Sequence, residues 1–439
     1  MSQVRERPEE LLATGSSGRT AVWGWVVAAV YFFYQYVLRS APSVMMPQLS
    51  EAFGIGSLGV ASLVGLFYYG YATCSLVAGA AMDGLGPRKA LPLAAAVVGV
   101  GALLFASGSR DSANVGRLLQ GAGGVFAPVG AIYIVMRYFP ASRGATLIGA
   151  TQMFGMAGGA AGQFVVGPLI GRGLTWDKFW IGMGVVALAM GLLLFAVLPT
   201  ETRAKPAEGW FKSVAESYYV VFKNPQSILC GLIAGLLFIP TTIFDMVWGV
   251  RYLEEAHGFD YASAVMRSAT VPLGWIVGCP LLGFISDRLG QRKPVIIGGS
   301  LVLSVCLACI LYGPKSFFPP YALGLVAGLA SGAAMLPYTV IKEVNPPQFC
   351  GTSTGVMNFI NSIFSALLGP VFGWILHRVS GRTAQMEQAH YQVAFAPLLF
   401  GVGVAIVLTL LLQETGPRSK HRPHESDASN QATESAPLR

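Results

Sequence analysis

Charged residues are scarce in this sequence. Of its 439 residues only 11% are charged, whereas 54% are hydrophobic. A soluble domain carries roughly 25% charged residues, so a water-covered surface is excluded. Uncharged runs of about 20 residues, the length that crosses the hydrocarbon core of a bilayer, recur along the chain. The sequence therefore predicts an all-α membrane protein with the lipid bilayer as its solvent.

Motifs for cofactors and for catalysis are also lacking. The sequence has no G-x-x-x-x-G-K-[ST] phosphate-binding loop, so we do not expect ATP hydrolysis to drive the protein. No Ser-His-Asp, Cys-His or paired-carboxylate arrangement indicates an enzyme. Cys306 and Cys309 form a C-x-x-C, but inside an apolar run with no His nearby. We therefore expect neither a disulfide framework, nor a metal site, nor a cofactor.

Twelve apolar runs are present, in two groups of six. They span approximately residues 21–46, 58–82, 90–108, 115–137, 145–169, 179–199, 227–252, 263–286, 295–313, 320–341, 352–376 and 392–413. We accordingly divide the chain into an N-terminal segment (1–20), a first bundle (21–199), a linker (200–226), a second bundle (227–413) and a tail (414–439). The tail is rich in Ser, Pro and charge, which predicts disorder.

The net charge of +8 is unevenly distributed. Lys and Arg gather before the first run, in the linker, in the tail and in every second loop. By the positive-inside rule this bias predicts that both termini and the linker face the cytoplasm. Since orientation accounts for the basic excess, we expect no nucleic-acid binding. The predicted location is the bacterial cytoplasmic (inner) membrane, or an intracellular membrane derived from it.

Internal repeats relate the two groups of runs. GAAMDGLGPRK (79–89) recurs as GFISDRLGQRK (283–293), and GPLIG (167–171) recurs as GPVFG (369–373). The offset is nearly constant at about 200 residues, which indicates two halves of one duplicated design. Parallel repeats of this kind are known in membrane transporters.

The repeated loop resembles the signature of the major facilitator superfamily, G-x-x-x-D-x-x-G-x-R-K. RLLQG (117–121) is similar to that family's R-x-x-Q-G element. The resemblance covers about 21–413. It implies twelve transmembrane helices in two six-helix halves, and secondary transport by alternating access. The signature residues are Gly79, Asp83, Gly86, Arg88 and Lys89 in the first copy, and Asp287, Arg288 and Arg292 among those of the second.

The chemistry of this loop predicts a conformational latch. Asp83 ends the second run beside a Gly-rich turn and two cations. A carboxylate there can pair with Arg88 and can lie at the N-terminus of a neighbouring helix. Such contacts form in one arrangement of the halves and break in the other. The alternative is a plain turn with solvated charges.

Four ionisable residues fall inside the apolar runs: Arg39, Arg117, Asp245 and Arg267. Such residues usually face a cavity or a partner. YQYVLRSAPSVMMP resembles the first span of organophosphate and organic-anion porters, whose arginine contacts the anionic substrate. It also resembles the first span of intraphagosomal amino-acid porters and of magnetosome-membrane porters. The alternative for Arg39 is snorkelling to the headgroups. We predict substrate contacts for Arg39, Gln35, Tyr31, Arg117, Asp245 and Asn358.

The seventh run departs from the phosphate exchangers. Thr242 stands where they carry a second arginine, and Asp245 follows it. This difference favours a monocarboxylate or a zwitterion over phosphate. Asp245 could contact the cationic end of a zwitterion. It could exchange protons with each side of the membrane as the protein rocks, with Arg117 and Arg267 as coupling partners. It could also form a structural pair with Arg267. These interpretations stay open.

The sequence thus predicts a proton-coupled symporter or antiporter for a small organic anion or zwitterion, carboxylates and amino acids included. One alternative is a transporter of iron or an iron complex, which the resemblance to magnetosome porters suggests. Another is a sensor or scaffold of the same fold that has lost transport. The expected partners are the small-molecule substrate, protons and lipid; an oligomer is not required.

Overall fold

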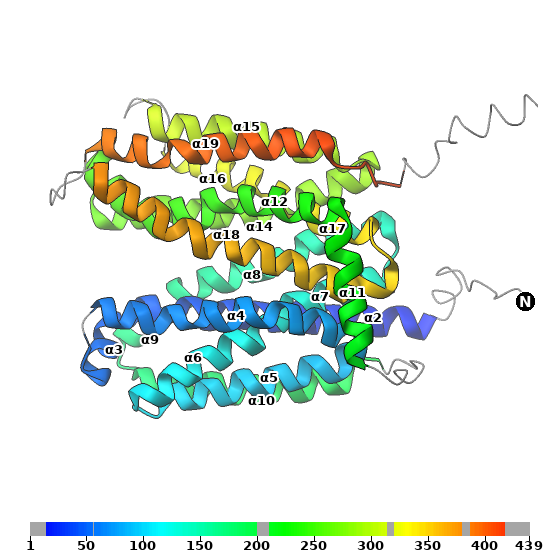
Figure 1. Cartoon of the computed structure of the whole chain (residues 1–439). Helices are drawn as coiled ribbons and strands as arrows, with labels where there is room; N and C mark the ends of the chain where they lie inside the picture. Colours follow the sequence, from blue (N-terminus) through cyan, green and yellow to red (C-terminus); the bar gives the residue numbers. More distant parts are fainter. Residues whose placement is uncertain (1–14, 56, 200–209, 314–319, 380–386, 418–439) are drawn as a thin grey trace, which may run out of the picture.

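Two bundles of helices lie side by side in the computed structural model (Figure 1). The structure describes residues 15–55, 57–199, 210–313, 320–379 and 387–417. Within these ranges the regular structure is helical throughout, without a β-strand. The N-terminal half, blue to cyan, fills the lower part of Figure 1, and the C-terminal half, green to red, fills the upper part.

Six spans make up the N-terminal half. Two of them are broken into consecutive helices, and the short α3 (Met46–Phe53) follows the first span. The spans are α2 (Gly15–Ser40), α4 (Ser57–Leu85), α5 (Pro87–Ala106), α6 (Arg110–Gly124) with α7 (Phe126–Tyr138), α8 (Gly144–Phe164) with α9 (Val166–Gly171), and α10 (Trp176–Val197).

The C-terminal half repeats this arrangement. Its spans are α12 (Pro225–Ile239) with the π-helical segment η3 (Pro240–Trp248) and α13 (Gly249–His257), α14 (Tyr261–Leu289), α15 (Lys293–Tyr312), α16 (Pro320–Ser331) with α17 (Leu336–Glu343), α18 (Cys350–Val379), and α19 (Gln388–Leu411). Among the described residues, eleven spans are long and apolar enough to cross a membrane by length and composition. The one remaining predicted run, 352–376, forms the 30-residue α18, which lies alongside α4. The prediction of twelve helices in two six-helix halves is confirmed.

The linker forms one helix that crosses both halves. α11 (Trp210–Lys223) runs over α4 and α18 at the right of Figure 1, the side on which the first and last described residues also lie. We call this side the linker end and the opposite side the far end. Of the predicted terminal segments, residues 1–14 and 418–439 lie outside the described residues, as do 200–209 of the linker.

Each signature loop turns on a glycine at the linker end. Gly86 has φ 76° and Gly290 has φ 64°, a region that residues with a β-carbon rarely adopt. Gly290 directly follows the last residue of α14, and α5 begins directly after Gly86, with Pro87 in its first turn. The glycines of the motif are thus explained by backbone geometry.

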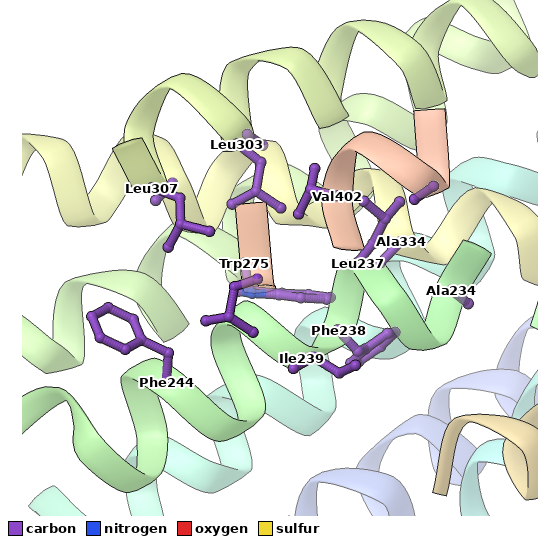
Figure 2. Close-up of a cluster of buried hydrophobic side chains, with 14 of the residues drawn as sticks. Ala234, Leu237, Phe238, Ile239, Phe244, Trp275, Leu303, Leu307, Ala334 and Val402 are labelled. Atoms are coloured by element: carbon purple, nitrogen blue, oxygen red, sulfur yellow. The ribbon is translucent and has the colours of Figure 1, made fainter. Parts of the chain in front are cut away.

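A hydrophobic cluster fills each half, and the two clusters meet at Trp25, Tyr36 and Met136, which pack against both. Figure 2 shows part of the C-terminal cluster, where Trp275 lies near Phe238. The two ring centroids are 4.9 Å apart. The indole Nε1 of Trp275 donates to Thr241 Oγ1 at 3.0 Å, so the cluster also holds a buried polar group.

Candidate latch and candidate anion site

Asp83 lies near the C-terminal end of α4 and binds the first turn of α18. Its carboxylate accepts from the backbone N–H of Gly351 at 2.7 Å, and from the N–H and hydroxyl of Thr352 at 2.5 and 2.6 Å. The first N–H groups of a helix have no partner within the helix, and the helix dipole favours an anion there. Asp83 therefore links the N-terminal half to the C-terminal half through an N-cap contact.

Asp287 repeats this contact in the opposite direction. It lies near the end of α14 and accepts from the N–H groups of Ala145 at 3.4 Å and Thr146 at 2.8 Å, and from the Thr146 hydroxyl at 2.7 Å. α8 begins at Gly144, so this is again the first turn of a helix in the other half. The contacts that a latch requires are thus present twice, related by the internal repeat.

Glycines let the halves touch backbone to backbone beside these caps. A β-carbon on Gly79 would lie 2.7 Å from the carbonyl oxygen of Gly351, and one on Gly283 would lie 2.4 Å from that of Ala145. A β-carbon on Gly149 would lie 2.1 Å from the carbonyl oxygen of Cys279. No side chain fits at such distances, so the α4–α18 and α8–α14 seams are closed at the linker end.

The cations of the two loops have different surroundings. Arg292 is fully buried and pairs with Asp287 at 2.7 Å and Glu343 at 2.9 Å. Burial by itself lowers the pKa of Arg292, but the hydrogen bonds and charges of Glu343 and Asp287 outweigh it and raise the pKa above its ordinary value. The guanidinium carbon of Arg88, for which the sequence allows a pair with Asp83, lies 5.0 Å from the ring centroid of Phe195.

The remaining residues near the latch are two exposed cations and two residues that make further contacts. Lys89 and Arg288 are the exposed cations. Glu414, at the start of the segment expected to be disordered, instead accepts from the backbone N–H groups of Arg292 at 2.6 Å and Lys293 at 3.1 Å. Glu414 therefore ties the chain after α19 to the loop before α15. The linker helix adds a further link, since the Tyr218 hydroxyl donates to the Leu76 carbonyl.

Arg39, near the end of α2, lies between two tyrosines. Its guanidinium carbon is 5.1 Å from the ring centroid of Tyr36 and 4.9 Å from that of Tyr68, and its Nε donates to the Tyr68 hydroxyl at 3.3 Å. Arg39 forms no ion pair with the described carboxylates. The outer edge of the guanidinium fork is therefore available for an anion that comes from outside the chain.

A series of polar groups leads from this arginine to the C-terminal half. Tyr71 of α4 lies within electrostatic range of Arg39, Tyr36 and Tyr338. Tyr338 of α17 donates to Asn358 Oδ1 at 3.0 Å, and Nδ2 of Asn358 has no hydrogen-bond partner among the described residues. The candidate anion site thus consists of Arg39 with tyrosines of both halves and Asn358.

Two predicted site residues lie elsewhere on α2. Tyr31 stacks on Tyr34 at 6.2 Å and belongs wholly to the N-terminal hydrophobic cluster. Gln35 is fully buried against Gly124, and neither atom of its amide has a partner within the described chain. The structure therefore places Tyr31 and Gln35 inside the N-terminal half, whereas Tyr36 lies between the halves.

Arg117 is fully buried in the N-terminal half. Its Nη1 donates to Gln120 at 2.7 Å and its Nη2 to the Val64 carbonyl at 3.3 Å, and its guanidinium carbon is 5.1 Å from the Phe67 ring centroid. No described carboxylate pairs with it, and it lies within electrostatic range of Arg39. Two cations without counter-ions consequently share this part of the molecule.

The structure brings Asp245 and Arg267 together. Asp245 Oδ1 and Arg267 Nη1 are 3.1 Å apart, and both side chains are buried. Asp245 Oδ2 has no partner among the described residues. The carboxylate also lines a cavity of about 20 Å³ with Thr241 and Ser331, room for about one water molecule. Leu303, Leu307 and Ala327 close this cavity from α15 and α16, which places it inside the C-terminal bundle, apart from Arg39.

Sequence reasoning missed Tyr68 and Tyr71, which lie near Arg39, and the threonines that receive the two aspartates. The signal for the tyrosines was present, because FYYGY (67–71) places Tyr68 and Tyr71 on one face of the second span. The threonines carried no local signal, since Thr146 and Thr352 become binding partners only when the halves meet. Among the described residues, His, Cys, Asp and Glu form no group of three that could hold a metal.

Comparisons with known proteins agree with the signature loops. The sequence profile of a family described as the Major Facilitator Superfamily matches residues 27–370 and 269–438. The probable sulfoacetate transporter SauU of Cupriavidus necator is 25% identical over 373 residues, which cover 80% of this chain and 86% of that protein. A hexuronate transporter of Bacillus subtilis is 26% identical over 387 residues, which cover 83% of this chain and 90% of that protein. The membrane sensor protein UhpC of Salmonella typhimurium is 23% identical over 430 residues, covering 90% and 92%.

Solved structures show the same fold. The E. coli fucose:proton symporter FucP has a TM-score of 0.69, with 90% of this chain and 99% of that chain covered at 15% identity. The proton:xylose symporter XylE has a TM-score of 0.70, with 92% and 97% covered, also at 15% identity. At this identity the likeness concerns the fold alone.

Proposed function

Because the chain belongs to the Major Facilitator Superfamily, a family of multi-pass membrane transporters and not of enzymes, we propose that its cargo is a small organic anion. The observation that carries this proposal is the Arg39 guanidinium, held between Tyr36 and Tyr68 without a described carboxylate. A charge-assisted fork of donors is suited to a carboxylate or sulfonate. Arg117 adds positive potential to the same region.

Two relatives support an anionic cargo. The names of the matched proteins from Cupriavidus necator and Bacillus subtilis specify sulfoacetate and hexuronate, both of which carry acidic groups. A zwitterion such as an amino acid has less support. The acid expected to meet its cationic end, Asp245, is paired with Arg267 inside the C-terminal bundle.

We further propose that transport is coupled to protons through Asp245. One of its carboxylate oxygens binds Arg267, the other has no partner among the described residues, and the residue lines a water-sized cavity. Protonation would weaken the ion pair and release Arg267, which gives the pair two states. The nine-residue π-helical segment that carries Asp245 supports this role, because π-helical turns within α-helices are frequent at functional sites. The alternative is a static structural pair.

The orientation completes the proposal. The linker end, with its excess of Lys and Arg, would face the cytoplasm of a bacterial cell, and the far end would face the periplasm. The closed α4–α18 and α8–α14 seams then make this an arrangement that is shut toward the cytoplasm. Opening would break both aspartate caps.

Purified protein in proteoliposomes tests the cargo. We expect uptake of carboxylates or sulfonates, stimulated by an inward proton gradient and absent without protein. Amines, neutral sugars and iron complexes serve as the other members of the panel. Uptake of an iron complex with no uptake of any organic anion would contradict the proposal.

A sensor is the second candidate, because the matched Salmonella protein is named a membrane sensor. A sensor would bind an anion without moving it. Ligand-induced thermal stabilisation together with zero flux in the same preparation would favour this candidate over transport.

A further inference from the structure

Lys342 in the last turn of α17 is a buried cation that forms no ion pair with the described carboxylates. Only 6% of the residue is exposed, and its Nζ has no hydrogen-bond partner in the part of the chain that the structure describes. The adjacent Glu343 does not neutralise it by direct contact. That carboxylate is engaged by Arg292 and by the hydroxyl of Thr415.

Lys342 lies where the halves meet, because α17 contacts α8 of the N-terminal half. The Cys350 thiol, in the first turn of α18, lies within electrostatic range of Lys342 and also of Asp83 and Arg137. Asp83 ends α4 and Arg137 ends α7, so both belong to the N-terminal half. Cys350 itself packs against the N-terminal hydrophobic cluster. Lys342 therefore lies at the closed linker end, at the level of the Asp83 cap.

Burial of a lone ammonium group is unfavourable. Lysine normally avoids this cost by extending its flexible stem to water. Here α17 packs against α8, and Cys350 packs against the N-terminal hydrophobic cluster, so separation of the halves at the linker end would relieve this cost. If the contact between Asp83 and α18 breaks, the ammonium group would become accessible to an anion in the vestibule that forms.

We propose that Lys342 is a second anion-binding residue of the transport path, which receives the acidic group of the cargo when the linker end is open. The assignment rests on the proposed anionic cargo. It gives the path one cation near each end. Arg39 would bind the anion through a planar fork of donors. Lys342 carries a compact, hydrated charge whose hydrogen bonds are less directional, which favours release of the cargo.

Transport measured separately from the linker side and from the far side tests the assignment, with the variants Lys342→Met and Lys342→Arg. The probes are sulfoacetate and glucuronate. We expect Lys342→Met to raise the KM measured from the linker side by about tenfold, the loss of one charged hydrogen bond. The KM from the far side should change little, and Lys342→Arg should retain most of the wild-type value. Lys223→Met is the matched control, since Lys223 is an exposed cation at the same end whose Nζ contacts only Tyr219 among the described residues.

Alkylation of Cys350 gives a readout independent of flux. The thiol is 8% exposed in the closed arrangement, so its reaction with N-ethylmaleimide, followed by peptide mass spectrometry, reports opening of the linker end. Bound sulfoacetate or glucuronate should slow this reaction in the wild type and in Lys223→Met, but not in Lys342→Met. If Lys342→Met does not fold, Lys342→Gln takes its place.

The outcomes separate the two proposals. Wild-type flux of anions with unchanged linker-side KM in Lys342→Met would overturn the role of Lys342 and leave the cargo proposal standing. Absence of anion flux in the wild type would overturn the cargo proposal. In that case the alkylation of Cys350 still tests the binding site. If a bound anion slows alkylation in the wild type but not in Lys342→Met, the site at Lys342 is supported. If the anion does not slow alkylation in the wild type, the site is overturned as well.

Discussion

Arg39 shows what a single side chain contributes. The sequence identified it from its place in an apolar run, and the structure adds the two tyrosines that hold it. The surroundings of Tyr31 and Gln35 could not be derived from the sequence, because the interior of one half and the interface between halves are equally apolar. Helical spacing fixes which residues share a face, but it does not tell which neighbour that face meets.

Replacement of Arg39 separates an anion site from a membrane anchor. Arg39→Lys keeps the charge but loses the fork, so substrate affinity should fall moderately. Arg39→Ala should cost about 1.5–3 kcal/mol of binding free energy, as for loss of a charged hydrogen bond. Substrate affinity by calorimetry measures both. Arg172→Ala, at an exposed position of the far end, is the control. Equal affinity in wild type and Arg39→Lys would leave Arg39 as an anchor.

Replacement of Asp245 distinguishes coupling from a structural pair. Asp245→Asn removes the exchangeable proton, so accumulation against a gradient should be lost while counterflow exchange persists. Uptake and counterflow assays in the same vesicles measure the two activities. Full concentrative transport in the double variant Asp245→Asn with Arg267→Gln would show that the pair is structural and would end the coupling role.

Helix termini are the elements through which the halves meet. The repeated loops predicted that each aspartate could lie at a helix N-terminus, but not that Asp83 binds α18 and Asp287 binds α8. That pairing depends on how the halves dock, which the local sequence does not encode. The span boundaries, in contrast, follow closely from hydropathy and from the loop glycines.

The two caps should respond differently to the same substitution. Asp83→Asn weakens one cap and should impair transport with a stability loss of about 1 kcal/mol. Asp287→Asn also removes a partner of the buried Arg292, so the loss should be larger, toward the ~3–5 kcal/mol of a broken buried pair. Thermal unfolding in detergent together with flux measures both effects. Undiminished flux in Asp83→Asn would count against the latch.

At the scale of the whole molecule, closure of the linker end depends on backbone contacts that allow no side chain. The C-terminal half is tied within itself at this end, since Asp287, Arg292, Glu343 and Glu414 connect four segments of it. Motion of one half against the other would therefore break the contacts between halves before those within the C-terminal half.

A methyl group in one seam should hold the linker end open. Gly149→Ala places a β-carbon against the Cys279 carbonyl, so α8 and α14 must separate. We expect faster alkylation of Cys350 and slower transport. Gly182→Ala in α10 is the control, because nothing lies within 4 Å of its added β-carbon. Equal alkylation in the two variants would contradict the closed seam.

The central claim is that an acidic group on the cargo is required and is held by Arg39. Counterflow of glucuronate and of glucose in proteoliposomes tests it most directly, since the two sugars are of similar size and differ chiefly in one carboxylate. We predict exchange of glucuronate without exchange of glucose in the wild type, and loss of glucuronate exchange in Arg39→Ala. Exchange of glucose at the same rate, or glucuronate exchange that survives in Arg39→Ala, would contradict the claim.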